Sequence, residues 1–559
     1  MSDVTQAFAA TFVDELAVQG VEFACVSPGS RSAPIAMALQ RHPRIKVLVQ
    51  IDERCGSFFA VGLGKATGKP AVVLSTSGTA AAEFHAAVVE ASYSRTPLIV
   101  LTADRPPELQ GVGANQAIDQ QHLYGSAVRW FVDPGAPTDL PNAARTWRRL
   151  AARAVAEAAN GPVHVNLPFR EPLVPPPGKP PAAEPAPAQA VTSGRLLPSQ
   201  AQVASLASAL QRAQRPLIVA GELRDGESLA PALHRLGLPL LAEPTSQLRR
   251  AEAGAAIESY EALLRAGWSL QHGPDLVIRI GATPTSRVLN RWLTAAAAPT
   301  FLIDPDRAWR DEDHVATNVM VCDPQPLLEA VPPVDRMAWR DQWVTAGKRA
   351  SAAIAASMVS TPLHEGHVVR ALSARLPDPG QVFIGSSMPI RAADSFWPLA
   401  RPKQRFFGNR GASGIDGLVS SGLGVATARD AVPTVLLLGD LSLYHDMNGL
   451  WALQRHGIRA TLVVCDNNGG GVFNFLPQAE HQDVFEEIFA TPLGLDLSQV
   501  ARLYGLVYSP VSDRSGLEPA IADAIAAPTP TMVVVRFKRE DSVSGHRLCW
   551  EAAASALKG

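Results

Sequence analysis

Two short apolar runs, TVLLLGDLS at 434–442 and TLVVCDNNGG at 461–470, decide the fold of this chain. Each run has the length and composition of a strand buried on both faces, and each ends abruptly in small polar residues. The interval between Asp440 and Asn467 leaves room for one helix and the next strand, as in a parallel βαβ unit. Adjacent parallel strands bring their carboxyl ends together, so we expect Asp440, Asn467 and a backbone carbonyl near Gly469 to lie close in space.

These three groups would offer oxygen ligands and no Cys or His to a metal ion. Such a set suits Mg²⁺, with Mn²⁺ as a possible substitute. The neighbouring glycines and a helix start would also let backbone N–H groups approach a diphosphate. Taken alone, the segments around Asp440 and Asn467 could equally be two ordinary strand-to-helix turns, in which Asp, Asn and Gly are frequent.

The same rhythm of apolar strands and amphipathic helices continues along the whole chain. Examples are AVVLSTSG at 71–78, DLVIRIGA at 275–282 and QVFIGSSM at 381–388. We therefore predict an α/β protein with three doubly wound parallel-sheet domains. A stretch with seven prolines, PPPGKPPAAEPAPAQA, reads as an extended linker. The expected parts are a first domain at 1–174, the linker at 175–190, a central domain at 191–345 and a last domain at 346–559.

Composition excludes several classes of protein. With 47% hydrophobic and 18% charged residues and a net charge of −2, nothing favours nucleic acid or an anionic membrane as partner. The start, MSDVTQAFAA, lacks the features of a signal peptide, and no apolar run approaches the ~20 residues of a membrane helix. The five scattered cysteines form no CxxC motif and fit a reducing compartment. We expect a cytoplasmic protein.

Ligands of doubly wound sheets bind at the carboxyl ends of the strands. Residues there are mostly Gly, Ser, Asp, Asn and Arg, and they occupy 27–32, 52–54, 75–79, 104–105, 386–391, 439–442 and 466–471. Four arginines at predicted strand ends attract notice, because the guanidinium fork binds a carboxylate with two parallel hydrogen bonds. They are Arg31, Arg105, Arg391 and Arg410. A single arginine in such a place is more often part of a surface ion pair.

GD followed by NN resembles the signature of thiamine diphosphate-dependent enzymes, GDG followed by NN, although Leu441 stands where the signature has its second glycine. The GDLS form resembles one branch, the 2-succinyl-5-enolpyruvyl-6-hydroxy-3-cyclohexene-1-carboxylate (SEPHCHC) synthases of menaquinone biosynthesis. Segments similar to that branch are SPGSRSAP (27–34), DERCGSFFAVGLGKATGKP (52–70), STSGTAAAEFHAAVVEA (75–91), LTADRPPEL (101–109), GANQAIDQ (113–120), GNRGASGIDGL (408–418) and NNGGGVFNFLP (467–477). The central domain matches best at GATPTSR (281–287).

The resemblance implies a cofactor, a metal and a catalytic acid. Thiamine diphosphate would lie between pyrimidine-binding and diphosphate-binding domains, and Glu53 matches the glutamate that hydrogen-bonds N1′ of its aminopyrimidine. The metal ligands would be Asp440, Asn467 and Gly469. The implied cofactor-binding residues are Glu53, Ser77, Gly78, Ile415, Gly439, Asp440, Leu441, Ser442, Val472 and Phe473. Among them, Ile415 matches the residue that props the cofactor into its bent form, and Val472 and Phe473 would line an apolar wall.

The resemblance also implies the substrates and the assembly. The family decarboxylates 2-oxoglutarate and adds the remaining succinyl unit 1,4 to isochorismate. Residues matching the isochorismate or adduct site are Ser30, Arg31, Arg105, Asn115 and Gln116, with Ser30 and Arg31 also near the chemistry. Ser387, Arg391 and Arg410 match the grip on the succinyl carboxylate, and Arg287 is a looser candidate. A homodimer or homotetramer is implied, in which Glu53 acts on cofactor held by the partner subunit's Asp440 and Asn467.

Other interpretations remain open at this point. The chain could be another thiamine diphosphate-dependent 2-oxo acid carboligase or decarboxylase, or a cofactor-binding protein without activity. Two further features stand apart from the motifs. Arg279 interrupts an apolar strand and is expected to form an ion pair, the alternative being a regulatory anion pocket with Arg307. The segment HEGH at 364–367 lacks metal-site spacing and is expected to begin a helix.

Overall fold

The computed structural model describes residues 2–178 and 181–558, and its framework is three sheets in which every strand pair is parallel. This confirms the predicted fold class. The chain divides into two compact units. Unit 1 comprises residues 1–193, 409–431 and 442–459, and unit 2 comprises residues 194–408, 432–441 and 460–559.

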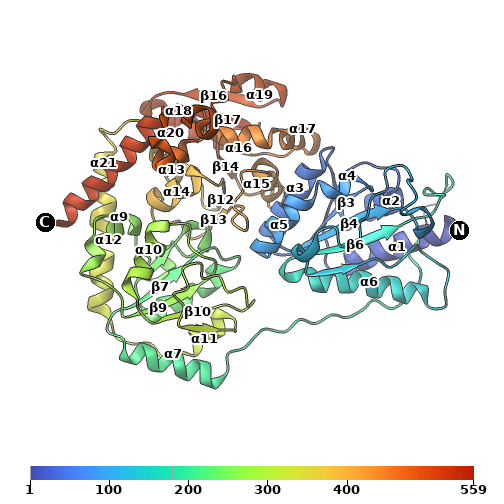
Figure 1. Ribbon diagram of the computed structural model, residues 1–559, viewed down its shortest axis with the longest axis horizontal. Coiled ribbons are helices and arrows are strands. Elements are labelled where there is room, and N and C mark those ends of the chain that lie inside the picture. The colour runs from blue at the N-terminus through green and yellow to red at the C-terminus, as the bar shows by residue number, and fades with distance from the viewer. Residues whose placement is uncertain (1, 179–180, 559) are drawn as a thin grey trace. The chain divides into compact units, whose positions relative to one another are not determined.

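Unit 1 contains the first sheet, of six strands in the order β2-β1-β3-β4-β6-β5. The strands are β1 (Phe23–Val26), β2 (Lys46–Val49), β3 (Ala71–Ser75), β4 (Leu98–Asp104), β5 (Trp130–Val132) and β6 (Pro162–Pro168). The accompanying helices are α1 (Ser2–Val18), α2 (Ala33–Arg41), α3 (Glu53–Thr67), α4 (Thr79–Ala82), α5 (His85–Ser94) and α6 (Ala143–Glu157). The central strands β3, β4 and β6 are buried along their whole length, which explains their continuous apolar sequence (Figure 1).

Two helices from later in the sequence complete unit 1. They are α15 (Leu418–Ala428) and α17 (Trp451–His456). Helix α15 packs along α3 so closely that backbone meets backbone: a Cβ on Gly62 would lie 2.0 Å from the carbonyl oxygen of Ser421. A Cβ on Gly424 would lie 2.2 Å from the carbonyl oxygen of Phe59. Glycine at these two contacts therefore sets the spacing of the helix pair.

Unit 2 contains the other two sheets. The second sheet has the order β11-β10-β9-β7-β8, formed by β7 (Pro216–Ala220), β8 (Leu240–Ala242), β9 (Leu276–Ile280), β10 (Thr300–Ile303) and β11 (Asn318–Met320). Its helices are α7 (Gln200–Arg212), α8 (Ala230–Leu236), α9 (Tyr260–Arg265), α10 (Arg287–Ala296), α11 (Pro324–Ala330) and α12 (Met337–Ser357). One hydrophobic core runs from this sheet into the third sheet, so the two form a continuous body.

The third sheet has the order β13-β12-β14-β15-β17-β16. Its strands are β12 (Gly380–Ile384), β13 (Gln404–Phe407), β14 (Thr434–Gly439), β15 (Thr461–Asp466), β16 (Val507–Val511) and β17 (Thr531–Arg536). The remaining helices are α13 (Glu365–Arg375), α14 (Met388–Phe396), α16 (Asp440–His445), α18 (Gln482–Val484), α19 (Leu497–Leu503), α20 (Arg514–Ala526) and α21 (Arg539–Lys558). Counted within each sheet, this strand order repeats that of the first sheet. In both, the order reverses beside the first strand, which is where doubly wound sheets bind ligands.

The proline-rich segment is extended where it is described. Between residues 181 and 199 it forms neither helix nor strand, and residues 179 and 180 lie outside the described part. The amide of Glu184 donates to the Thr11 hydroxyl (2.9 Å) and that of Gln189 to the Glu15 carboxylate (3.1 Å), so α1 supports this segment. The expected domain boundaries at 174, 190 and 345 remain proposals, and α12 continues across residue 345.

Across residues 2–178 and 181–558, the helices are all too short or too polar to cross a membrane.

Candidate active site

At the carboxyl edge of the first sheet, hydrogen bonds join Arg105 to three other predicted residues. Its guanidinium donates to the Ser77 hydroxyl (2.6 Å) and to the carbonyl of Asn115 (2.6 Å). The Ser77 hydroxyl donates to the carbonyl of Gln116 (2.8 Å), whose side-chain amide returns a hydrogen bond to the Ser77 carbonyl (3.0 Å). Arg105 is buried, whereas Asn115 and Gln116 are exposed. The structure thus joins these four residues, and Gly78 follows Ser77 with a positive φ of 81° that favours glycine.

Arg31 lies close enough to Arg105 for the charge of Arg105 to affect it. Burial, with Arg105 next, lowers the pKa of Arg31. Its guanidinium donates to the carbonyl of Phe169 (2.9 Å) and forms a 3.4 Å ion pair with the exposed Glu171. Ser30 precedes it and is exposed. Two buried cations at one sheet edge attract an anionic ligand.

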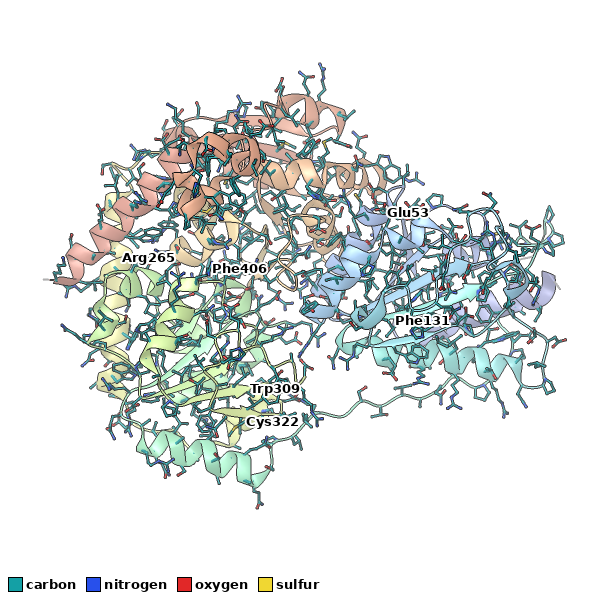
Figure 2. All side chains as sticks on the ribbon, in the orientation of Figure 1. Glu53, Phe131, Arg265, Trp309, Cys322 and Phe406 are labelled. Carbon is teal, nitrogen blue, oxygen red and sulfur yellow. The ribbon has the colours of Figure 1, made fainter. Side chains whose placement is uncertain are left out.

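Glu53 is the first residue of α3, directly after β2 (Figure 2). The side chain of Asp52 caps the helix by accepting from the amide of Cys55 (3.1 Å), which leaves the Glu53 carboxyl to point elsewhere. Glu53 is half-buried, and burial followed by the charges of Asp52 and Glu83 raises its pKa. Burial favours the protonated form of this carboxyl, which suits a group that shares a proton with a ligand.

The segment before α15 carries Arg410 and Ile415, both partly buried. The buried Glu90 of α5 accepts from the amides of Gly411 (3.0 Å) and Ala412 (2.7 Å) and pairs with Lys65 of α3 at 3.2 Å. This carboxylate therefore attaches the Arg410–Ile415 segment to α3 and α5. The first sheet's Glu53 and this segment belong to the same unit.

Asp440 occupies the predicted place at the end of β14. Its carboxylate accepts from the amides of Leu441 (2.9 Å) and Gly469 (2.7 Å), the second of which lies beyond the neighbouring strand β15. Burial raises the pKa of Asp440 to about 7, against the effect of these two hydrogen bonds. Gly439 precedes it, and the buried Ser442 follows in α16. A carboxylate desolvated to this degree is stabilised by a cation.

Asn467 lies at the end of β15, where the prediction placed it. Its side-chain oxygen is buried and accepts no hydrogen bond within the described chain. Gly469 adopts φ 135°, and a Cβ on it would lie 2.2 Å from the carbonyl oxygen of Ala490. A Cβ on Gly471 would lie 2.4 Å from the Asn467 amide nitrogen. The sequence of three glycines at 469–471 is therefore a steric requirement of this turn.

Other predicted residues of unit 2 lie on separate elements. Ser387 precedes α14 with a positive φ of 69°, an uncommon conformation for serine that recurs at functional sites, and its carbonyl accepts from Arg391 (2.7 Å). Val472 and Phe473 are partly buried in the short helix Gly471–Phe475, where the Phe473 ring lies 5.6 Å from that of Phe489. Arg287 is exposed at the start of α10, and no described contact joins it to the other predicted residues.

Two features outside the motifs have simple explanations. Arg279 is buried and forms the expected ion pair, with Asp311 at 2.5 Å, and it also donates to the carbonyl of Arg310 (3.0 Å). His364 directly precedes α13, so the HEGH segment begins a helix as predicted. The anion pocket with Arg307 is not needed to explain the buried charge of Arg279.

The sequence did not predict the residues that hydrogen-bond or pair with the elements carrying the site residues. They include Glu90, Lys65, Cys55, Gln120 and Asp446. Gln120, for example, accepts from the amide of Gly78 (3.0 Å) and donates to Asn166 (2.8 Å). Only tertiary contacts reveal such roles, although all of these residues except Asp446 lie inside the quoted motif segments.

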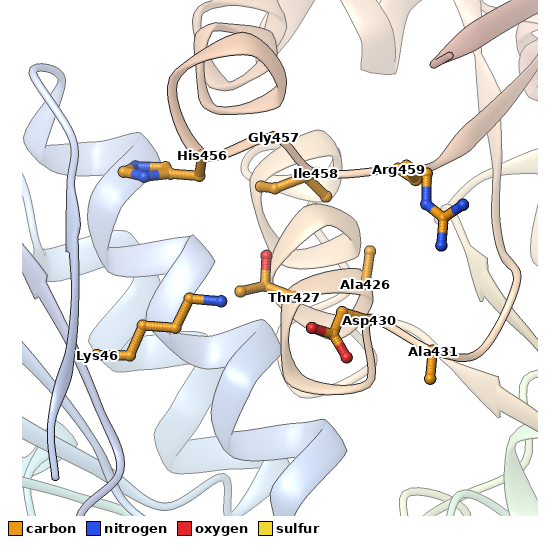
Figure 3. Close-up of a pocket in the computed structure, with 9 residues that line it drawn as sticks. All are labelled: Lys46, Ala426, Thr427, Asp430, Ala431, His456, Gly457, Ile458 and Arg459. Atoms are coloured by element: carbon orange, nitrogen blue, oxygen red, sulfur yellow. The ribbon is translucent and has the colours of Figure 1, made fainter. Parts of the chain in front are cut away.

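A pocket of about 370 Å³ lies beside β2, the edge strand of the first sheet (Figure 3). Lys46, at the amino end of β2, contributes to it together with Asp430, His456 and Arg459. His456 donates to the carbonyl of Val49 (2.9 Å). Because neither Glu53 nor Arg105 lines it, this pocket is distinct from the group of residues around them.

Comparison with known proteins places these features in a family. Three family models match in succession: the N-terminal binding domain of thiamine pyrophosphate enzymes over residues 6–123, their middle domain over 195–384, and their C-terminal binding domain over 387–535. The 2-succinyl-5-enolpyruvyl-6-hydroxy-3-cyclohexene-1-carboxylate synthase of Geobacillus kaustophilus is 42% identical, over 100% of this chain and 99% of its own length. Synthases of the same name from Bacillus velezensis and Haloarcula marismortui are each 39% identical, covering 98% and 100% of this chain and 97% and 99% of their own lengths.

The chain belongs to the SEPHCHC synthase family. The resemblance inferred from seven motif segments is thereby confirmed, as is the thiamine diphosphate-enzyme fold.

The residues present fit the cofactor that the family's domains imply. At the third sheet, the unpartnered Asn467 oxygen and the desolvated Asp440 carboxylate have the chemistry of cation ligands, and the glycine turn between them has no room for a side chain. Nowhere in the described ranges do three or more His, Cys, Asp or Glu side chains gather as a metal site. The inferred metal ligands of this SEPHCHC synthase family member are one carboxylate, one side-chain amide and one backbone carbonyl. Such a metal site requires no cluster of that kind.

Proposed function

We propose that this chain uses thiamine diphosphate and a divalent cation to decarboxylate 2-oxoglutarate and to join the remaining succinyl unit to isochorismate by 1,4 addition. The product is SEPHCHC, an intermediate of menaquinone biosynthesis. Full-length membership of the SEPHCHC synthase family carries the proposal. The buried pair Arg31 and Arg105, at one ligand-binding sheet edge, supports substrates that bear several carboxylates.

Asp440, Asn467 and the carbonyl of Gly469 would hold Mg²⁺, or Mn²⁺ in its place, together with the diphosphate. When bound, the cofactor supplies the carbon nucleophile and the electron sink that decarboxylation requires. The amide of Gly469 donates to the Asp440 carboxylate and that of Gly470 to the carbonyl of Ala490. The glycine turn would therefore hold the Asp440 carboxylate in place for the cation. Leu441 and Ser442 would line the same turn, Val472 and Phe473 would exclude water from the reacting carbon, and Ile415 would support the bend of the cofactor.

Glu53 would share a proton with N1′ of the aminopyrimidine. Its raised pKa and its place at the start of α3 suit a carboxyl that holds a proton at one atom and releases it to that ring nitrogen. The neighbouring negative charges of Asp52 and Glu83 favour the protonated form, and the half-buried setting limits exchange with water.

The arginines would position the two substrates. Isochorismate would be held by Arg31 and Arg105, with Ser30, Asn115 and Gln116 as hydrogen-bonding neighbours. The side-chain carboxylate of 2-oxoglutarate would be held by Arg391 and Arg410 near Ser387, with Arg287 as an outer candidate. The bond between C1 and C2 of 2-oxoglutarate breaks with release of CO₂, and its C2 becomes bonded to the isochorismate ring. Fixed cations at both ends would keep the reacting carbons aligned.

The assembly and location are part of the same proposal. We propose a homodimer or homotetramer in which Glu53 of one subunit acts on cofactor held by the partner subunit's Asp440 and Asn467. Sedimentation of the active enzyme as a monomer would contradict this arrangement. The five cysteines are all free and buried, which supports a reducing, cytoplasmic location.

The decisive test follows the ring absorbance of isochorismate in the presence of protein, thiamine diphosphate and Mg²⁺. Absorbance should fall only when 2-oxoglutarate is present. Glu53→Gln should reduce kcat by about 10²- to 10⁴-fold, because the substitution removes the acid–base group while keeping its shape. Glu83→Gln is the matched control, since it removes a neighbouring charge and should retain most of the activity. An unchanged kcat in Glu53→Gln would reject the assigned role of Glu53.

The alternative is another thiamine diphosphate-dependent carboligase or decarboxylase. It predicts turnover of pyruvate, whereas the buried arginines favour dicarboxylic substrates. If cofactor-loaded protein consumes pyruvate and leaves isochorismate unchanged, the alternative replaces the proposal.

A further inference from the structure

Helix α14 carries two of the proposed substrate residues at its start. Ser387 directly precedes the helix, and Arg391 is the only exposed one of its nine described residues. The helix follows β12, which pairs in parallel with β14, and Asp440 comes directly after β14. Arg391 and Asp440 therefore belong to the same edge of one sheet in one chain. In the proposed function they serve the same cofactor site, whichever subunit supplies Glu53.

The last turn of α14 is held by Arg249, a fully buried arginine from the segment that follows β8. Its guanidinium donates to the backbone carbonyls of Asp394 (2.6 Å) and Trp397 (3.3 Å), and also to the Asp394 carboxylate. Its Nε donates to the carbonyl of Ala242 (2.7 Å), the last residue of β8. One side chain thus joins the end of α14 to the second sheet.

Helix α9 supplies two further contacts to the same turn. The Tyr260 hydroxyl donates to the Asp394 carboxylate at 2.7 Å, and the centre of its ring lies 5.4 Å from the central carbon of the Arg249 guanidinium. The Ser395 hydroxyl donates to the buried carboxylate of Glu261 at 3.0 Å. Two successive residues near the end of α14 are therefore bonded to α9.

Packing alone does not require these polar groups. Tyr260, Phe396 and Trp397 all belong to the continuous hydrophobic core of unit 2. Burial raises the pKa of Asp394, and the charge of Arg249 opposes this effect. Replacing a buried ion pair by apolar residues is often neutral for stability, so the pair is weak evidence of a stabilising role. The pair does supply direction, because all three guanidinium nitrogens of Arg249 donate from a rigid, planar fork.

We propose that Arg249 and Asp394 are positioning residues for 2-oxoglutarate. By fixing the end of α14, they fix how Arg391 and Ser387 meet the side-chain carboxylate of this substrate. Asp394 lies three residues after Arg391, about 4.5 Å along the helix axis, so a shift of the last turn moves the first. The inference rests on the proposed function for the role of Arg391. Arg249 and Asp394 act through the helix and do not contact the substrate.

The test replaces Arg249 by lysine, which keeps the charge and loses the fork. Cofactor-loaded Arg249→Lys and wild type are compared on 2-oxoglutarate and on 2-oxopentanoate, in which a methyl group replaces the distal carboxylate. We expect kcat/KM for 2-oxoglutarate to fall about 10- to 100-fold and that for 2-oxopentanoate to change less than about threefold. The second substrate has no carboxylate for Arg391 to hold. Release of CO₂ in the presence of isochorismate measures both values.

A second measurement does not depend on turnover. Titration calorimetry with glutarate, which has both carboxylates but no keto group, should give a Kd about 10-fold higher in Arg249→Lys. Tyr260→Phe removes one hydrogen bond to Asp394 and keeps the ion pair, so it should raise this Kd about 2- to 5-fold. Arg279→Lys is the matched control, because it weakens the buried ion pair with Asp311 in the same sheet. It should bind glutarate like the wild type.

Two outcomes would overturn the inference. One is an Arg249→Lys protein that loses activity equally with the two 2-oxo acids or keeps the wild-type Kd for glutarate, which would make the pair purely structural. The other applies if Arg249→Lys does not fold: a wild-type Kd in Tyr260→Phe would remove the proposed connection to Arg391.

Failure of the proposed function gives a different result. If wild-type protein binds glutarate yet does not consume isochorismate, the proposed carboligation fails, while the Kd values of the variants still test the positioning role. Wild-type protein that neither binds glutarate nor consumes 2-oxoglutarate would overturn the inference together with the assigned role of Arg391.

Discussion

The first and third sheets share one strand order but differ in the chemistry at their carboxyl ends. After the third strand in sequence, the first sheet carries Ser77, and the third sheet carries Asp440 at the end of its equivalent strand β14. After the next strand, the first sheet has Arg105 and the third has Asn467. In the proposed function, equivalent positions would thus present donors for an anion in one sheet and oxygen ligands for a cation in the other. Topology determines where a ligand can bind, and the side chains determine which ligand it is.

The residues that follow the second strand also differ between the first and third sheets. Glu53 follows β2 and opens α3, whereas the segment of Arg410 and Ile415 follows β13 and precedes α15. The two helices are topological equivalents, and within unit 1 they pack against each other. The buried Asp446 bonds the two helices together, because its carboxylate accepts from Cys55 in α3 and from Ser420 in α15.

The largest expected effect comes from removing Asp440, the proposed cation ligand of the third sheet. Asp440→Ala should weaken binding of thiamine diphosphate with Mg²⁺ by at least about 10²-fold, because hydrogen-bonded charge at a desolvated site is worth several kcal/mol. Titration calorimetry measures the change, and activity should vanish with it. Asp523→Asn, on an exposed residue of α20, should bind the cofactor normally. Equal cofactor affinity in the two variants would break the assignment of cation chemistry to this sheet.

An effect of intermediate size is expected on KM, and arginines of the first and third sheets should affect different substrates. Arg105→Lys should raise KM for isochorismate about 10- to 100-fold, since lysine cannot keep the fork that donates to Ser77 and Asn115. Arg391→Lys should raise KM for 2-oxoglutarate instead. Steady-state kinetics with each substrate varied in turn measures both values. If each variant affects both substrates equally, the division of substrates between the two sheets is wrong.

The smallest expected effect concerns stability in unit 2 alone. Burial lowers the pKa of His546 to about 4 and that of His364 to about 2, from an ordinary 6.5. A histidine with a lowered pKa binds fewer protons when folded than when unfolded. Above pH 6.5 the histidine is neutral in both states and costs no stability. As the pH falls from 6.5 towards 4, the unfolded state binds a proton that the folded state does not, so the free energy of unfolding decreases.

His546→Gln should reduce this acid sensitivity by about 1–3 kcal/mol between pH 6.5 and 4.5. Guanidinium unfolding followed by tryptophan fluorescence measures it, because the Trp550 ring lies 5.6 Å from His546. The acid sensitivity contributed by His164 of unit 1, whose pKa burial lowers to about 3, should persist. His481→Gln, an exposed histidine, should behave like the wild type. Unchanged acid sensitivity in His546→Gln would show that the buried histidines do not control it.

Local sequence was sufficient to predict the strand-end residues of the fold. Asp440 and Asn467 end adjacent strands, and Glu53 opens a helix, because short apolar runs ending in Gly, Asp or Asn have few other structures available. Arg279 could be predicted to be paired, since a charge in an apolar strand demands a partner, but Asp311 could not be named. Residues such as Asp446 and Glu90 escaped prediction because nothing in their local sequence distinguishes them from surface carboxylates.

The sequence by itself determined the fold class, the strand ends and the family, because apolar periodicity and motif spacing are local properties of the chain. Tertiary structure alone decided which distant groups meet: Asp446 with Cys55 and Ser420, Glu90 with the Arg410 segment, and Arg105 with Ser77. Those contacts depend on how closely two helices can approach at their glycines. They also depend on which buried hydrogen-bond donors still need an acceptor. No local sequence pattern predicts either factor, because both arise only after the sheets and helices have packed.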